Sequence, residues 1–209
     1  MAADAVLFDF DGVIVESEHI KTEAFRRLYA PYGPAVVAAA VAHHRAHGGI
    51  SRRKKIRHCH RTLLATELSP DELDELCHRF SSLVEDQVVA SPMVPGAEAL
   101  LQALHGRLPL FIVSGTPQEE LLRIVDRRDL SRYFDGIFGS PTEKPELIRD
   151  ILARHGLSAD RCLFIGDAMT DYEAARVCGM PFVGRVAAAD RDPFPLGTKV
   201  IPDLTGFVP

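Results

Sequence analysis

Three short stretches of almost uninterrupted apolar residues stand out along the chain, at residues 5–10, 109–113 and 162–165. Each is followed directly by a glycine and a polar residue. A short apolar stretch of this kind is typical of a strand buried on both faces of a parallel sheet. Two weaker stretches, residues 181–186 and 199–201, add a fourth and a fifth predicted strand.

Between these stretches, apolar residues recur every three or four positions, which predicts helices. The predicted helices cover residues 97–104, 118–125, 146–155 and 172–178. Strands that alternate with helices in this way predict an α/β fold, a Rossmann-like doubly wound parallel sheet.

The segment after the first strand breaks this alternation, because helical spacing continues there without a buried-strand stretch. Its clearest helix, residues 71–84, is opened by Ser69-Pro70-Asp71-Glu72, which supplies a capping serine, a proline at the first helical position and early acidic residues. We therefore expect an α-helical domain at residues 16–91. It is inserted into a core domain that consists of residues 1–15 and 92–209.

The composition is that of a globular protein, with 46% hydrophobic and 25% charged residues among 209. A net charge of -5 gives no reason to expect nucleic acid or an anionic membrane as partner. The longest apolar run, residues 35–42, is far shorter than the ~20 residues of a membrane span. The four cysteines form no Cys-x-x-Cys pair and the N-terminus has no basic signal segment, so we expect free thiols in a reducing cytoplasm.

Charge is distributed unevenly within the predicted helical domain. Residues 24–66 contain nine Arg or Lys and five His, but no Asp or Glu. On a solvated surface this would be only a basic face, whereas beside an active site it would attract an anionic substrate. No nucleic-acid recognition motif accompanies the charge, so we expect no nucleic-acid binding.

Acidic residues follow two of the predicted strands. Asp9 and Asp11 end the first strand, where alternation directs both side chains to the same side, and Asp167 and Asp171 follow the third. Ligands of open parallel sheets bind at this carboxyl edge. Carboxylates that lie close together repel each other, and a hard divalent cation such as Mg²⁺ removes that repulsion.

The remaining polar groups at this edge suit a phosphate. Ser114, Gly115 and Thr116 follow the second strand and offer hydroxyl and N–H groups at an expected helix start, and Lys144 precedes a predicted helix. Such a set fits phosphoryl transfer, in which one carboxylate forms an aspartyl-phosphate and a second acts as general acid and base. A metal ion and a lysine neutralise the developing charge.

Four motifs, in order along the chain, resemble those of the haloacid dehalogenase (HAD-like) superfamily. They are Phe-Asp-Phe-Asp-Gly-Val-Ile at 8–14, Ile-Val-Ser-Gly-Thr at 112–116, Lys-Pro at 144–145 and Gly-Asp-Ala-Met-Thr-Asp at 166–171. The sequence is most similar to the branch that contains phosphoglycolate phosphatases and β-phosphoglucomutases.

The resemblance implies roles for the acidic residues. Asp9 is the expected nucleophile and Asp11 the expected general acid and base. Mg²⁺ is expected between the side chains of Asp9 and Asp167 and the backbone carbonyl of Asp11. Asp171 either orients Lys144 or a water on the metal, or serves as a helix N-cap. The presence of Asp11 and Asp167 favours phosphate chemistry over dehalogenation.

The resemblance also implies which groups bind the phosphate. Ser114 is expected to bind phosphoryl oxygens, with support from Thr116 and from backbone N–H groups near Gly115. Lys144 is expected to pair with Asp9 and the phosphate.

The inserted helices resemble the movable cap of this branch, which closes over the substrate and supplies specificity. The expected specificity loop contains Gly49, Ser51 and Arg52, and Arg52 is expected to contact a distal anionic or hydroxyl group of the substrate. β-Phosphoglucomutases usually carry a histidine where this chain has Lys21, which favours hydrolysis over a mutase reaction.

The expected function is therefore Mg²⁺-dependent hydrolysis of a small anionic phosphomonoester, either a sugar phosphate or a phosphoglycolate-like substrate. A sugar-phosphate mutase is the alternative, and it would need a bisphosphate and release little free phosphate. A non-catalytic binding module that uses the basic cap is an alternative of another class, in which Asp9→Asn would change nothing. The sequence leaves the oligomeric state open.

Overall fold

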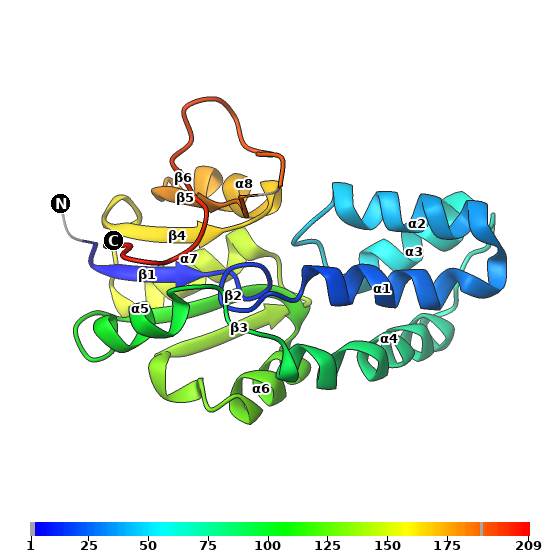
Figure 1. Cartoon of the computed structure of the whole chain (residues 1–209), viewed down its shortest axis with the longest axis horizontal. Helices are drawn as coiled ribbons and strands as arrows, with labels where there is room; N and C mark the ends of the chain where they lie inside the picture. Colours follow the sequence, from blue (N-terminus) through cyan, green and yellow to red (C-terminus); the bar gives the residue numbers. More distant parts are fainter. Residues whose placement is uncertain (1–2, 189) are drawn as a thin grey trace.

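The structure is a computed structural model that describes residues 3–188 and 190–209. Within these residues, six parallel strands form one sheet in the order β3-β2-β1-β4-β5-β6 (Figure 1). The central strand β1 (Ala5–Phe8) lies between β2 (Leu110–Pro117) and β4 (Cys162–Gly166). The predicted doubly wound α/β fold is therefore confirmed.

The outer strands are β3 (Gly136–Ser140), β5 (Phe182–Arg185) and β6 (Val200–Ile201). The sequence did not predict β3, because glycines at both ends of its short apolar core leave too little signal. The first strand was predicted to continue to Phe10 but ends at Phe8. There the chain turns tightly, and the carbonyl of Phe10 accepts the N–H of Ile14 at 2.9 Å.

Both faces of the sheet are covered by helices, as the alternation of strands and helices predicts. The four helices are α5 (Ala97–Leu104), α6 (Gln118–Arg127), α7 (Lys144–His155) and α8 (Met169–Cys178). Val6 and Phe8 of β1 pack into one cluster with α5 and α6, and Ala5 and Leu7 pack into a second cluster with α7 and α8.

Four further helices follow β1 and lie together beyond the carboxyl edge of the sheet (Figure 1). We call them the helical insertion; they are α1 (Glu18–Tyr29), α2 (Pro34–Ala46), α3 (Arg52–Leu63) and α4 (Pro70–Ala90). Short 3₁₀ helices are η1 (Ala30–Tyr32), η2 (Ser131–Tyr133) and η3 (Ala159–Arg161). None of the helices in the described residues has the length and apolarity needed to cross a membrane.

The helical insertion has its own apolar centre. Phe25, Ile56, Leu73 and Phe80 are almost completely buried among its helices. The predicted start of α4 is confirmed, because the side chains and backbone of Ser69 and Glu72 form a reciprocal capping box. The helix extends six residues beyond its predicted end, to Ala90.

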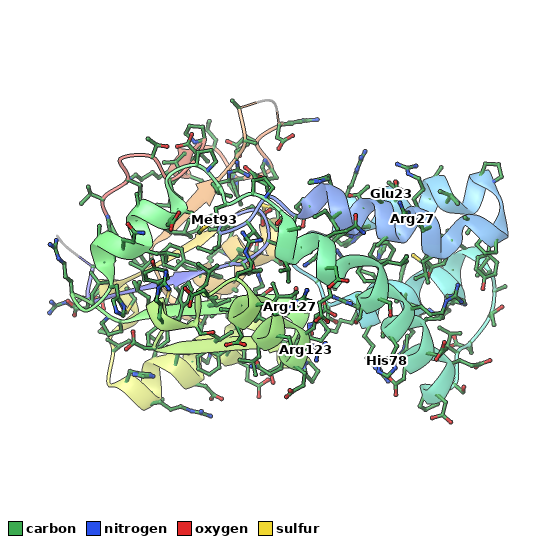
Figure 2. All side chains as sticks on the ribbon, turned by 60° about the horizontal axis from the view of Figure 1, so that its bottom comes forward. Glu23, Arg27, His78, Met93, Arg123 and Arg127 are labelled. Atoms are coloured by element: carbon green, nitrogen blue, oxygen red, sulfur yellow. The ribbon has the colours of Figure 1, made fainter. Side chains whose placement is uncertain are left out.

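The longest helix of the insertion leans on a core helix. Arg123 of α6 lies 2.8 Å from Glu85 of α4, and Arg127 lies 2.9 Å from Asp86. Figure 2 shows Arg123 and Arg127 where α6 meets α4. These exposed ion pairs each contribute little stability, but they place the insertion directly over the carboxyl edge of the sheet.

Candidate active site

The polar residues predicted at the ends of the first two strands gather in one pocket between the sheet and the helical insertion. Asp9 and Asp11 follow β1, and Ser114, Gly115 and Thr116 belong to β2. The backbone of Asp9 is fixed by its neighbour strand, because its N–H donates to the carbonyl of Ile165 at 2.9 Å. The insertion closes the opposite side of the pocket.

Asp9 is buried and only partly engaged by its surroundings. Its Oδ1 lies 3.0 Å from Lys144 Nζ, but no aligned hydrogen-bond donor reaches this oxygen within the described residues. Burial raises the pKa of Asp9 to about 7; the charge of Lys144 opposes this increase, whereas the charges of Asp171 and Asp11 add to it. Asp9 therefore keeps an oxygen available for a cation or for reaction.

Lys144 is the first residue of α7 and lies between two carboxylates. Its Nζ is 2.5 Å from Asp171 Oδ1 and 3.0 Å from Asp9 Oδ1. Burial opposes protonation of Lys144, but the charges of Asp171 and Asp9 outweigh it and raise its pKa. Lys144 is thus held as a buried cation directly beside Asp9.

Asp171 stabilises the start of helix α8 with one carboxylate oxygen and holds Lys144 with the other. It occupies the third position of α8 rather than the predicted N-cap, and its Oδ2 accepts the N–H of the N-cap residue Ala168 at 3.0 Å. Its other oxygen holds Lys144. Gly166 makes room for it, because a Cβ at that position would lie 2.3 Å from the Asp171 Cβ.

Asp167 completes a cluster of three carboxylates. One oxygen from each of Asp9, Asp167 and Asp171 lies within 4.8 Å of the others. Burial first, and then the charges of Glu18, Asp9 and Asp171, raises the pKa of Asp167 well above its usual value. A divalent cation with oxygen ligands fits this cluster, because it would compensate the repulsion and bind the unengaged oxygen of Asp9.

Not all three carboxylates of this cluster are free to bind such a cation. Asp171 is already committed to Lys144 and to the helix, so Asp9 and Asp167 are left. Asp167 lines a neighbouring pocket together with Lys144. Gly12, at φ +77°, lets the turn after β1 pass against Asp167, since a Cβ there would lie 2.1 Å from Asp167 Oδ2.

Asp11 differs from Asp9 because both of its carboxylate oxygens have hydrogen-bond partners. Ser17 Oγ donates to its Oδ1 at 2.6 Å, Thr116 Oγ1 donates to Oδ2 at 3.0 Å, and Lys21 forms an ion pair with Oδ2. Burial would raise the pKa of Asp11, but the charge of Lys21 and these hydrogen bonds outweigh it and lower the pKa. Asp11 is therefore ionised in the free protein.

Ser114 and Thr116 extend β2 into the pocket. They were expected at a helix start, but α6 begins only at Gln118, so both residues have strand geometry instead. Ser114 is buried, and its Oγ accepts the N–H of Thr116 at 3.2 Å. The hydroxyl of Ser114 therefore lies in the same pocket as Asp9. Ser114 is not at the start of helix α6, as had been expected.

The predicted specificity loop lies directly on the core. Thr170 Oγ1 donates to the carbonyl of Gly48 at 2.8 Å, and a Cβ on Gly115 would lie 2.4 Å from the carbonyl oxygen of Gly49. Ser51 is half-buried at the N-cap of α3. The insertion is therefore closed over the strand ends in this structure.

Arg52 lines the pocket but is paired with a core residue. Its Nη2 lies 2.5 Å from Glu120 Oε1, its Nη1 donates to Ser81 at 2.9 Å, and its guanidinium lies 4.5 Å from the centre of the Phe80 ring. The contact between Arg52 and a substrate remains a prediction. The observed role of Arg52 is to join α3 and α4 to α6.

Three titratable pocket residues are missing from the predicted site, Glu18, His44 and Lys55, and Lys21 was noted only as standing where β-phosphoglucomutases carry a histidine. The excess of basic residues was the signal that could have found His44 and Lys55. That signal covers the whole segment 24–66, so it does not distinguish a buried lysine such as Lys55 from an exposed one such as Lys54.

The carboxyl edge of this doubly wound sheet carries two aspartates after β1, a hydroxyl on β2, a buried lysine and two further aspartates after β4. This arrangement is typical of a hydrolase of phosphoryl groups. The haloacid dehalogenase-like hydrolase family model matches residues 3–179. The chain therefore belongs to this family, as its motifs predicted.

Known relatives agree with this assignment. The chain is 27% identical over 191 residues to a phosphorylated carbohydrates phosphatase of Thermotoga maritima, covering 85% of this chain and 82% of the relative. It is 30% identical over 185 residues to a phosphoglycolate phosphatase of Synechococcus elongatus, covering 84% and 80%. The fold matches a predicted phosphoglycolate phosphatase from Haemophilus somnus with a TM-score of 0.73, at 17% identity and coverage of 98% and 96%. The protein is thus an enzyme of the phosphatase type.

Proposed function

We propose that the protein is a Mg²⁺-dependent phosphatase that hydrolyses a small phosphomonoester through an aspartyl-phosphate on Asp9. The observation that carries this proposal is the contrast between two neighbouring carboxylates. Asp9 has an oxygen without an aligned donor beside Lys144, whereas Asp11 is fully hydrogen-bonded and ionised. One suits a nucleophile and the other a general base.

In the first step a carboxylate oxygen of Asp9 attacks phosphorus, and the bond from phosphorus to the leaving oxygen breaks. The negative charge of a bound phosphate raises the pKa of Asp11 by repulsion, so that Asp11 carries the proton that the leaving oxygen receives. Asp11 takes up this proton from solvent as the substrate binds, and Lys21, which contacts Asp11 and Thr116, orients the Asp11 carboxyl group.

In the second step Asp11, again a carboxylate, accepts a proton from water. The resulting hydroxide attacks phosphorus, the bond between Asp9 and phosphorus breaks, and phosphate leaves. Lys144 and Ser114 hold phosphoryl oxygens during both steps. Mg²⁺, held by the side chains of Asp9 and Asp167 and by the backbone carbonyl of Asp11, would supply further charge neutralisation at the phosphate.

The helical insertion would act as the cap of this enzyme, with residues 16–91 closing over a core of residues 1–15 and 92–209. The loop that carries Gly49 already rests on Gly115. Closure of this kind excludes water and strengthens the electrostatic contacts inside. The names of the relatives support a sugar phosphate or a phosphoglycolate-like molecule as substrate.

The direct test is phosphate release from a panel of phosphomonoesters, with Mg²⁺ and with EDTA, by the wild type and by Asp9→Asn. We expect release that needs the metal and disappears in the variant. No release from any ester by the folded wild type would contradict the proposal. Turnover that requires a bisphosphate and liberates no free phosphate would indicate a mutase instead.

A further inference from the structure

The helical insertion presents a distinct set of groups to the active-site pocket. Phe25 of α1, His44 of α2 and Lys55 of α3 line it opposite Asp9 and Ser114. The cavity between the two sides is small, about 30 Å³, so the insertion has to open to admit a substrate and close again around it. A phosphate on Asp9 would then extend its remaining atoms toward the insertion.

Lys55 is a buried cation without a carboxylate partner. Its exposed fraction is 4%, and its Nζ donates to His44 Nδ1 at 3.0 Å and to the His44 carbonyl at 3.3 Å. Burial lowers the pKa of Lys55 to about 8, while the charge of Glu18 opposes that decrease and the charge of Lys21 adds to it. Lys55 therefore remains mainly protonated at neutral pH.

The other buried lysine and arginine side chains of the described residues do not share this property. Each of them has a carboxylate within ion-pair distance: Arg52 has Glu120, Lys144 has Asp9 and Asp171, and Arg185 has Glu16. Among the described residues, Lys55 has none. Burying an unpaired charge is costly, so a site that keeps one is prepared for an anion that comes from outside.

His44 holds Lys55 in place on the same wall. It is 2% exposed and stacks on Phe25 with ring centres 4.6 Å apart. Burial, followed by the charge of Lys55, lowers the pKa of His44 to about 2, so the ring is neutral. Because Nδ1 accepts from Lys55, the ring proton is on Nε2, which has no hydrogen-bond partner within the described residues.

We propose that Lys55, held in place by His44, binds a second anionic group of the substrate, and that this group is a carboxylate. The inference rests on the proposed phosphatase function and narrows its substrate to phosphorylated carboxylic acids. The single positive charge of the Lys55 ammonium group matches the single negative charge of a carboxylate. A second phosphate would bring more negative charge than Lys55 can compensate, beside the carboxylate of Glu18.

The neighbouring cations do not compete for this role. Arg52 is neutralised by Glu120, and Lys21 is neutralised by Asp11. The uncompensated positive charge on the insertion side therefore belongs to Lys55 rather than to Arg52, on which the sequence prediction was centred.

The test compares matched esters that differ only in the distal group. Phosphoglycolate is paired with ethylene glycol monophosphate, and 6-phosphogluconate with sorbitol 6-phosphate. The variants are Lys55→Met and, as control, Arg57→Met, which removes the same charge from an exposed position of the same helix. We expect the wild type to prefer the acids and Lys55→Met to raise KM for them roughly 10- to 100-fold, with kcat nearly unchanged.

The neutral partners separate a binding role from a structural one. Their KM should change less than about threefold in Lys55→Met, and Arg57→Met should behave as the wild type with all four esters. Equal losses for acids and neutral esters, or a wild type without preference for the acids, would overturn the carboxylate site.

A calorimetric measurement keeps this inference separate from the proposed reaction. 3-Phosphonopropionate imitates phosphoglycolate and has a CH2 group in place of the ester oxygen. We expect the wild type and Arg57→Met to bind it more tightly than propylphosphonate, and Lys55→Met to bind both alike. A wild type that binds both alike would overturn the inference, whether or not the enzyme releases phosphate.

Discussion

The two walls of the active-site pocket hold their charges in opposite ways. On the core side, Lys144 lies between Asp9 and Asp171, and Asp11 is held by Lys21 and two hydroxyls. On the insertion side, Lys55 is buried with only a neutral histidine as partner. On the core side the groups left for a partner are carboxylates that fit a cation, Asp9 and Asp167, whereas on the insertion side the cation Lys55 is left without a carboxylate partner.

This difference separates chemistry from selection. A reaction common to many phosphomonoesters needs groups whose positions and charges are fixed in advance, and the strand ends provide that rigidity. Choice among esters needs groups that are satisfied only by the correct partner, because a wrong partner then leaves a buried donor unpaired. The following predictions test whether the two walls can be altered independently.

The largest effect is expected from Lys144→Met. It leaves Asp9 and Asp171 without their shared cation, so the free energy of unfolding in EDTA should fall by about 3–5 kcal/mol. Activity should fall at least ~100-fold with every ester, because the phosphate loses a fixed positive charge. Chemical denaturation and steady-state kinetics measure the two changes.

Lys54→Met is the matched control for that experiment. Lys54 is exposed and pairs with exposed Glu143, so its removal should change stability by less than about 1 kcal/mol. If Lys54→Met and Lys144→Met destabilised the protein equally, the pairing described for the core wall would be wrong.

A smaller but more specific effect is expected from Lys21→Met. In the wild type the pKa of Asp11 is lowered, so in the proposed mechanism Asp11 can accept a proton from water down to acidic pH. Without Lys21, burial is opposed only by the hydrogen bonds from Ser17 and Thr116, so the pKa of Asp11 rises. The acidic limb of the pH–rate profile should therefore move to higher pH by at least ~1 unit.

Arg26→Met is the control on the same helix, since Arg26 is exposed and pairs only with Glu23 among the described residues. Its pH profile should overlay that of the wild type. An acidic limb that stays in place in Lys21→Met would show that Lys21 does not control Asp11.

How far the sequence predicts this site depends on how local each signal is. Asp9, Asp11 and Asp167 were identified because they directly follow buried strands, whose apolar character is visible in a few neighbouring residues. Strand β3 was missed because Gly136 and Gly139 dilute that signal. Residues whose position depends on one strand could be placed correctly.

The insertion wall could not be predicted in the same way. Lys54 and Lys55 are adjacent and chemically identical, yet Lys54 is exposed and Lys55 is buried. Only the packing of α3 against α1 and α2 decides which lysine meets His44. Arg52 was chosen from its motif, but its partner Glu120 lies on α6, 68 residues away.

The smallest effect is expected from Gly49→Ala, which tests closure of the insertion. Gly49 has φ +74°, and a Cβ there would lie 1.9 Å from Thr170 Oγ1, so the loop must lift from the core. We expect kcat/KM to fall roughly tenfold through loss of closure. Gly33→Ala is the control, because Gly33 also has positive φ but nothing lies within 4 Å of its Cβ position. Equal losses in both variants would mean that backbone strain, not closure, explains the effect.

The most direct measurement of the proposed mechanism is chemical trapping of the phosphorylated enzyme. The protein is mixed with a phosphomonoester and Mg²⁺, quenched during turnover and treated with borohydride, which reduces an aspartyl-phosphate to homoserine. We predict homoserine at position 9 by peptide mass spectrometry in the wild type, and unmodified Asn in Asp9→Asn. Steady phosphate release with unmodified Asp9, or with the modification at another carboxylate, would contradict the role of Asp9 as nucleophile.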